Sequence, residues 1–225
     1  MKFNFLTILA VVASIFLASC EYDNFDAPEF TLSGKVVYEG KTLGVRSNGT
    51  RLQLWQSGYP LRSAIDVFIN QDGYFSAKLF PGHYKVTRLG NSPWLQQATD
   101  SVALNITGDM QFDMPVTPYM TITNETIQKV GTTISAQLTV NRVVPTANLE
   151  VVRLYLSKLI LVDDLRNDGV TSANVANIVL GSPTTLTANI PDNMKNLDYV
   201  YARVGVKSSS SGEYTYSKVQ RIALK

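Results

Sequence analysis

The stretch INQDGYFSAKLFPGHYKV, residues 69–86, is the most informative part of the sequence for the fold. Its DG and PG pairs are turn signals, and the residues between them alternate between apolar and polar. In a strand this alternation places Phe75 and Leu79 on one face and Ser76 on the other. Because a sheet that is apolar on one face must be covered by another layer, the stretch predicts part of a β-sandwich.

The same pattern extends over most of the 225 residues. Seven strand-length runs, separated by Gly or Pro turns, lie between Phe30 and Pro118, and six more follow. This spacing predicts an all-β chain of two consecutive antiparallel β-sandwiches, at 29–118 and 119–225.

The second set of runs has three further features. The run LEVVRLYLSKLILV, residues 149–162, is long enough for two strands. A tyrosine shortly after a Pro-containing turn, Tyr199 or Tyr201, matches the tyrosine corner of immunoglobulin-like sandwiches. The segment 163–181 is long for a loop, and it is the one place where we allow for a helix.

The first 19 residues have the composition of a secretory signal peptide, with a basic start and an apolar run. Cys20, the only cysteine, follows Leu-Ala-Ser, which resembles the bacterial lipobox. That resemblance implies cleavage before Cys20, addition of fatty acyl chains such as palmitate, and anchoring in a membrane. The alternative is ordinary cleavage near Ala18, which leaves an incidental thiol.

Residues 20–28 form a polar tether with three acidic residues close behind Cys20. Acidic residues at this place resemble an export signal of surface lipoproteins, which implies the outer membrane and the cell surface. The alternatives are a plain solvated linker and a location on the periplasmic face.

The whole chain resembles a family of two-domain lipoproteins of unknown function encoded in polysaccharide-utilisation loci, beside starch-utilisation-type transporters. The segments GKVVYEG, LQLWQSGYP, QDGYFSAKLFPGHYKV and FDMPVTPYMTI carry the resemblance. It implies a carboxypeptidase-regulatory-like, or transthyretin-like, first sandwich and an immunoglobulin- or fibronectin-like second one. An accessory role in glycan capture follows only by association.

Several classes of function are disfavoured by composition. Without Lys2 the chain has 19 basic and 18 acidic residues, in no long block, which argues against nucleic acid as a partner. His83 is the only histidine, so a metal site of histidines and cysteines cannot form. Its place directly behind the Pro81-Gly82 turn predicts an exposed residue at the start of a strand, which disfavours a nucleophile assisted by histidine. We therefore expect no enzyme, metal or cofactor.

The segment DDLRNDGVTSAN, residues 163–174, partly resembles a calcium-binding loop. Asp164, Asp168 and Gly169 have suitable spacing, but Arg166 replaces a ligand and Val175 stands where a bidentate Glu is needed. The segment therefore does not match a calcium-binding loop.

Exposed aromatic residues are the best candidates for a glycan site, because sugars stack their C–H faces on aromatic rings. Strand alternation places Trp55 and Phe68 on the outer face of the first sandwich, where packing against a partner is the alternative. Tyr59 and Trp94 lie in loops, as platforms or as residues that anchor the loops.

Strand direction predicts which loops meet. Consecutive antiparallel strands place the loops at 40–50, 71–73 and 91–99 at one end of the first sandwich. Loops of the second sandwich at 143–148, 163–183 and 208–212 should face them. The candidate residues expected at this junction, in a groove or in a plain domain interface, are Trp94, Asn91, Asp163, Asp164 and Asp168.

The sequence is compatible with two functions. The first is a non-enzymatic surface lipoprotein that helps a transporter to capture oligosaccharide, directly or through a partner lipoprotein. The second is a structural or assembly role, in which the sandwiches act as a spacer or pair strands in a surface complex.

Overall fold

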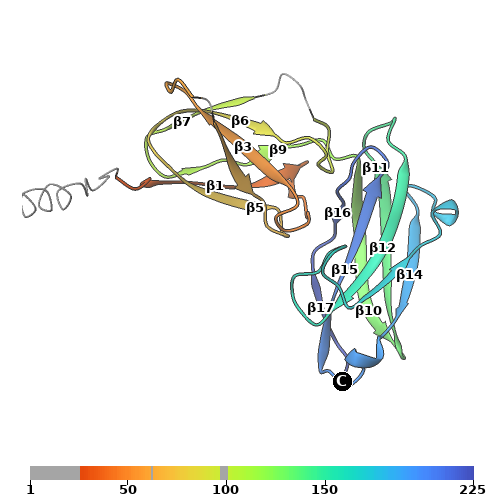
Figure 1. Cartoon of the computed structure of the whole chain (residues 1–225). Coiled ribbons are helices and arrows are strands. Elements are labelled where there is room, and N and C mark those ends of the chain that lie inside the picture. The colour runs from red at the N-terminus through yellow and green to blue at the C-terminus, as the bar shows by residue number, and fades with distance from the viewer. Residues whose placement is uncertain (1–25, 62, 97–100) are drawn as a thin grey trace, which may run out of the picture.

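A computed structural model describes residues 26–61, 63–96 and 101–225, so Cys20 lies outside the described residues. The chain is almost entirely β, and it forms two sandwiches in series (Figure 1). This confirms the predicted fold class. The described part contains two single 3-10 turns but no α-helix, and accordingly no helix that is long and apolar enough to cross a membrane.

The first sandwich consists of two sheets. One has β1 at its centre and the other has the order β4-β3-β6-β7. The strands are β1 (Phe30–Tyr38), β2 (Lys41–Thr42), β3 (Arg51–Gln56), β4 (Ala64–Phe68), β5 (Tyr74–Leu79), β6 (Gly82–Arg88), β7 (Val102–Ile106), β8 (Met110–Gln111) and β9 (Met114–Pro115).

The alternation in residues 69–86 has the predicted consequence. Phe75 and Leu79 of β5 are buried in the core between the two sheets, while Ser76 and Lys78 face solvent. One pairing differs from the prediction: β8 and β9 run parallel to β1. After β7 the chain crosses from one sheet to the other, and such a crossing permits parallel pairing where a hairpin does not.

The second sandwich also has two sheets, of order β10-β11-β14 and β13-β12-β15-β16, with β17 pairing to β15. Its core is almost wholly aliphatic. The elements are β10 (Met120–Val130), β11 (Thr133–Arg142), β12 (Leu149–Ser157), β13 (Gly169–Ser172), η1 (Val175–Asn177), β14 (Pro183–Asn189), η2 (Asp192–Met194), β15 (Tyr199–Ser208), β16 (Thr215–Tyr216) and β17 (Gln220–Ala223).

One expectation for this domain is wrong. The run 149–162 forms one strand, because β12 ends at Ser157 and the chain then turns outward with Leu159 and Ile160 exposed. The segment 163–181, where the sequence allows for a helix, contains β13 and the single 3-10 turn η1.

The tyrosine pair of β15 packs at the surface. The Tyr199 and Tyr201 rings meet edge to face with centroids 5.5 Å apart, and the Arg221 guanidinium lies 3.7 Å from the centroid of the Tyr199 ring. Among the described residues, no hydrogen bond of either hydroxyl marks a tyrosine corner.

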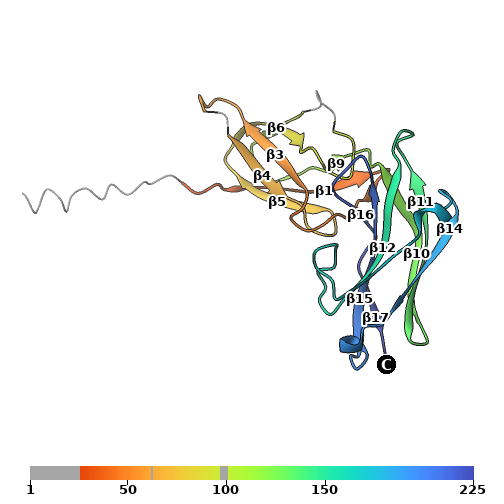
Figure 2. The ribbon, with the colours of Figure 1, turned by 45° about the vertical axis from the view of Figure 1, so that its right-hand side comes forward.

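The first sandwich lies across one end of the second, so the molecule is bent (Figures 1 and 2). A short link joins β9 to β10, and Trp94 forms a β-bridge with Pro118 within this link. The described chain begins at the end of the first sandwich that lies away from the second.

Candidate functional site

A buried arginine joins the two domains. Arg203 of β15 is fully buried, and its guanidinium donates to four backbone carbonyls. Those of Val45 and Gln71 belong to the first domain, at 3.1 and 2.5 Å. Burial lowers the pKa of Arg203 to about 10, so it stays protonated at neutral pH. A buried charge bonded to both domains fixes their relative position, because separating them would leave the charge without its acceptors.

An ionic cluster lies beside this arginine. Arg46 of the first domain bonds to the Glu213 carboxylate and lies 3.6 Å from that of Asp164. The Tyr216 hydroxyl donates to the same Asp164 carboxylate at 2.9 Å. Since all these side chains are at least half buried, the cluster holds the junction more firmly than exposed ion pairs would.

The candidate residues from the loops do meet at the junction, as strand direction predicts. The Asn91 side-chain oxygen accepts from the Gly212 amide at 2.7 Å, which joins the loop at 91–99 to the loop at 208–212. The Asp163 carboxylate is buried and is bonded by Arg166, whose guanidinium also donates to the Ser47 carbonyl at 2.8 Å. These residues are therefore committed to the domain interface.

The prediction that Trp94 stacks against a glycan is wrong. The side chain is 1% exposed and packs in the core of the first sandwich, so neither face of its ring can receive a sugar. Asp168 is also committed elsewhere: its carboxylate accepts from the Lys158 amide at 2.9 Å and closes the base of the loop after β12. Of the junction residues named from the sequence, Asn91, Asp163 and Asp164 thus belong to a plain domain interface, while Trp94 and Asp168 each stabilise their own domain.

The remaining aromatic candidates lie away from the junction. Tyr59 is 59% exposed in the loop after β3. Trp55 is partly exposed on the outer face of β3, and Phe68 is exposed on that of β4, as alternation predicts.

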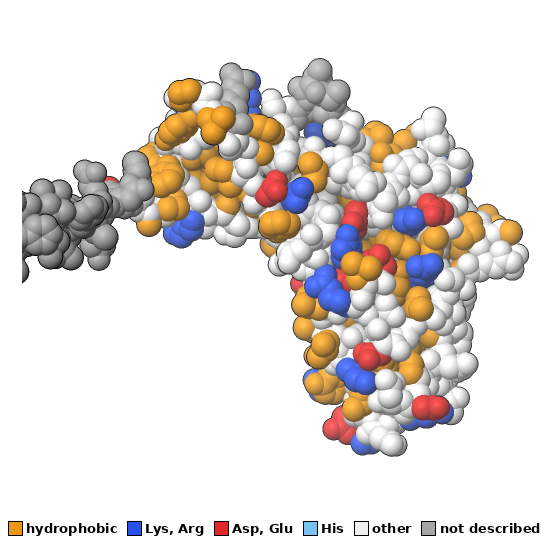
Figure 3. All heavy atoms as spheres, in the orientation of Figure 1, with side chains coloured by type: hydrophobic (Ala, Val, Ile, Leu, Met, Phe, Trp, Pro, Cys, Tyr) orange, Lys and Arg blue, Asp and Glu red, His pale blue; other side chains and the backbone are white. Residues whose placement is uncertain are grey.

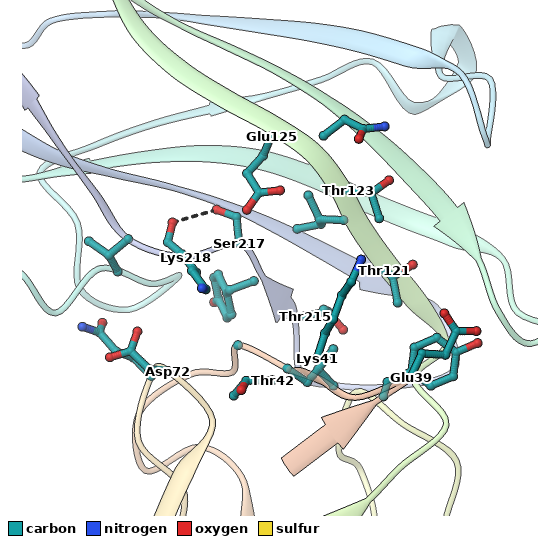
Figure 4. Close-up of a pocket in the computed structure, with 18 of the residues that line it drawn as sticks. Glu39, Lys41, Thr42, Asp72, Thr121, Thr123, Glu125, Thr215, Ser217 and Lys218 are labelled. Atoms are coloured by element: carbon teal, nitrogen blue, oxygen red, sulfur yellow. Dashed lines mark hydrogen bonds between the residues drawn. The ribbon is translucent and has the colours of Figure 1, made fainter. Parts of the chain in front are cut away.

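A groove of about 740 Å³ does lie between the domains, but other residues line it (Figure 4). The first domain contributes the β1–β2 hairpin and the turn before β5. The second contributes the first half of β10 and the strand β16 with the residues after it. The polar and aromatic lining residues are Tyr38, Glu39, Lys41, Thr42, Gln71, Asp72, Tyr74, Thr121, Thr123, Asn124, Glu125, Thr215, Tyr216, Ser217 and Lys218.

Unusual backbone shapes both walls of the groove. Glu39 and Gly40 have φ of 49° and 74°, so the β1–β2 turn has positive φ at both central residues, as a type I′ turn requires. On the opposite wall, Asn124 has φ of 54° at a bulge in β10. Bulges and positive-φ residues other than glycine concentrate at functional sites, where they redirect side chains.

The side chains of the groove present both donors and acceptors. Figure 4 shows Lys41 reaching from the first domain toward Thr121, and the Glu125 carboxylate directed toward Ser217. Partial burial, followed by the bond to the Glu39 carboxylate, raises the pKa of the Tyr38 phenol, which keeps it protonated as a donor.

The charges in the groove are free of one another. Its three carboxylates and two ammonium groups form no ion pair within the described part of the chain. Among the same residues, no cluster of His, Cys, Asp and Glu is placed to hold a metal ion. Such a lining suits a ligand rich in hydroxyl groups, which donate to carboxylates and accept from ammonium groups.

The fold and site define a two-domain all-β protein with a polar groove at a hydrogen-bonded junction. The chain belongs to the DUF3823 family of proteins of unknown function: residues 30–117 match its N-terminal domain and residues 120–221 its C-terminal domain. A comparison with curated proteins finds no match.

Solved structures share the architecture. A family member from Bacteroides ovatus is 41% identical with a TM-score of 0.84, and one from Parabacteroides merdae is 38% identical with a TM-score of 0.79. A candidate carbohydrate-binding protein from Bacteroides uniformis is 19% identical with a TM-score of 0.71, which shows the fold alone. Each alignment covers 88% of this chain and all of the other.

Proposed function

We propose that the protein binds a neutral oligosaccharide in the groove, without cleaving it, as an accessory to glycan uptake. The observation that carries the proposal is a groove lined by three tyrosines, Tyr38, Tyr74 and the buried Tyr216, among hydroxyl and charged side chains. Tyr74 is 51% exposed, so its ring is available for stacking. The volume lies within the range of ligand sites, about 300–1,000 Å³.

The charge balance supports a neutral ligand. Three carboxylates against two lysines give the lining a small excess of negative charge, which disfavours an acidic sugar. The fixed junction supports binding as well, because walls that need not close on the ligand lose little conformational entropy when it binds.

The proposal places no catalytic step in the groove. His83, the only histidine, lies on the outer face of β6 and is not a lining residue. A nucleophile activated by histidine is therefore not available to a ligand held there.

The cellular setting is part of the same proposal. We propose that Cys20 is acylated and holds the protein at the outer membrane, near a starch-utilisation-type transporter. The described chain begins at the end of the first sandwich away from the second, so a tether there would leave the groove free of the membrane. The candidate carbohydrate-binding protein from Bacteroides uniformis has the same two-domain fold.

Affinity electrophoresis on a panel of neutral polysaccharides tests the binding function. Binding predicts retardation on at least one glycan, whereas a spacer or assembly module would migrate unretarded on all of them. Metabolic labelling with a fatty acid tests the anchor: the wild type should be labelled and Cys20→Ala should not.

A further inference from the structure

The outer face of the sheet β4-β3-β6-β7 is a second surface with a defined chemistry. Leu52 and Leu54 of β3 point into the core, so Trp55 points outward. The described residues leave this face open to solvent, and Phe68 on it is 47% exposed. Figure 3 shows hydrophobic side chains gathered over the first domain.

Strand register places Trp55 in the middle of a row of outward residues. It is paired with Ala64 on β4 and with Lys85 on β6, and Lys85 is paired in turn with Ala103 on β7. The small alanine side chains at the two ends of the row leave the Trp55 and Lys85 side chains accessible from both sides. Neighbours paired across strands have Cβ atoms about 4.5–5.5 Å apart, so the indole and the Lys85 side chain are adjacent.

The orientation of the Trp55 ring is set by the sheet. Its Nε1 donates to the Thr87 hydroxyl at 3.1 Å, and that hydroxyl donates to the Gln53 carbonyl at 3.4 Å. The only polar atom of the indole is thereby satisfied, and the ring needs no further polar partner. An aromatic ring held in this way offers a preorganised platform for stacking.

Among the described residues, Lys85 on this face has no charged partner. Arg51 is paired with Asp66 at 3.3 Å, and Gln53 donates to the same carboxylate. Lys85 has no carboxylate partner within the described part of the chain, and its two cross-strand neighbours, Trp55 and Ala103, carry no charge. An exposed lysine is therefore the cross-strand neighbour of the fixed indole, and its ammonium group can reach a ligand stacked there.

We propose that this face is a second binding site, specific for acidic sugar residues of a polysaccharide. The C–H face of a uronic acid ring would stack on Trp55, and its carboxylate would be bound by Lys85. A flat, open face admits the middle of a long chain, whereas the groove suits a short neutral oligosaccharide. The second site does not depend on binding in the groove.

The test uses the mature protein with polygalacturonate, alginate and hyaluronate, and with methyl-esterified polygalacturonate as the uncharged control. The wild type should bind at least one uronate polymer. If it binds polygalacturonate, it should bind the methyl-esterified form of that polymer more weakly. Trp55→Ala and Lys85→Gln should each weaken binding about tenfold, as the loss of one stacked ring or one charge contact predicts. Lys78→Gln, which removes the same charge from the opposite sheet, should bind like the wild type.

Two results would overturn the proposal. One is a folded wild type that binds none of the three uronate polymers, which leaves the face as a protein contact or plain surface. The other is equal binding by Lys85→Gln and Lys78→Gln. Tyr74→Ala separates the two sites: if it abolishes uronate binding while Lys85→Gln does not, the polymer occupies the groove and the second site does not exist.

Discussion

The Arg203 guanidinium of the second domain donates a 2.5 Å hydrogen bond to the Gln71 carbonyl of the first. Gln71 in turn donates from its side chain to the Ile160 carbonyl of the second domain at 3.1 Å. Contacts in both directions couple the two sandwiches. The groove therefore behaves as part of one rigid body.

Replacement of the central arginine should uncouple the domains. Arg203→Met leaves four carbonyls without their donor, and we expect a loss of about 3 kcal/mol or more in the free energy of unfolding. Denaturant unfolding should change from one transition to two. Arg221→Met, at an exposed arginine stacked on Tyr199, is the control and should remain close to wild type. A single unshifted transition in Arg203→Met would contradict the coupling.

Trp94 should act on stability rather than on recognition. Because the side chain is 1% exposed in the core, Trp94→Ala should cost about 3–5 kcal/mol of unfolding free energy. Tyr59→Ala, at a residue that is 59% exposed, should change it by about 0.5 kcal/mol or less. Thermal and denaturant unfolding measure both, and comparable stabilities would show that Trp94 does not fill the core.

Substitution of Glu39 in the β1–β2 turn should change both the stability of the fold and the affinity for oligosaccharide. Asn before Gly is the preferred pair for a type I′ turn, so Glu39→Asn should stabilise the fold by about 0.5–1 kcal/mol. Loss of the Glu39 carboxylate should weaken oligosaccharide binding at the same time. A variant that is less stable than wild type would show that the φ of 49° at Glu39 carries no strain.

Asp168 should make stability depend on pH in the acid range. Bonds from the Lys158 amide, opposed by partial burial and assisted by the Lys158 charge, lower the pKa of Asp168. A carboxyl with a lower pKa in the folded chain stabilises the fold above its unfolded pKa of about 3.9. That contribution is lost as pH falls through the folded value. Asp168→Asn should thus be less stable than wild type at neutral pH, and the difference should shrink below pH of about 4.

Local sequence signals predicted the fold well. Turn pairs and alternation act over two to six residues, so they identified the strands of the first domain and the outward side of Trp55. Strand direction also identified the loops that meet at the junction, such as the one carrying Asn91.

Local sequence signals could not predict the burial of Trp94 or the lining of the groove. Trp94 lies in a loop, where no period separates inward from outward side chains, and its burial depends on tertiary packing. The groove combines Tyr38, Tyr74 and Glu125 with β16, and these are distant in sequence. The positive φ at Glu39, which marks one wall of the groove, is visible only in the structure.

Calorimetric titration of wild type, Tyr74→Ala and Tyr59→Ala tests most directly whether a neutral oligosaccharide binds in the groove. The titrant is the neutral glycan that retards the wild type in affinity electrophoresis. Both variants remove an exposed tyrosine of the first domain, but only Tyr74 lines the groove. Loss of one stacked ring should cost about 1–1.5 kcal/mol, which is roughly a tenfold loss of affinity. We expect this loss for Tyr74→Ala and wild-type affinity for Tyr59→Ala. Unchanged affinity in Tyr74→Ala, with loss in Tyr59→Ala, would contradict it.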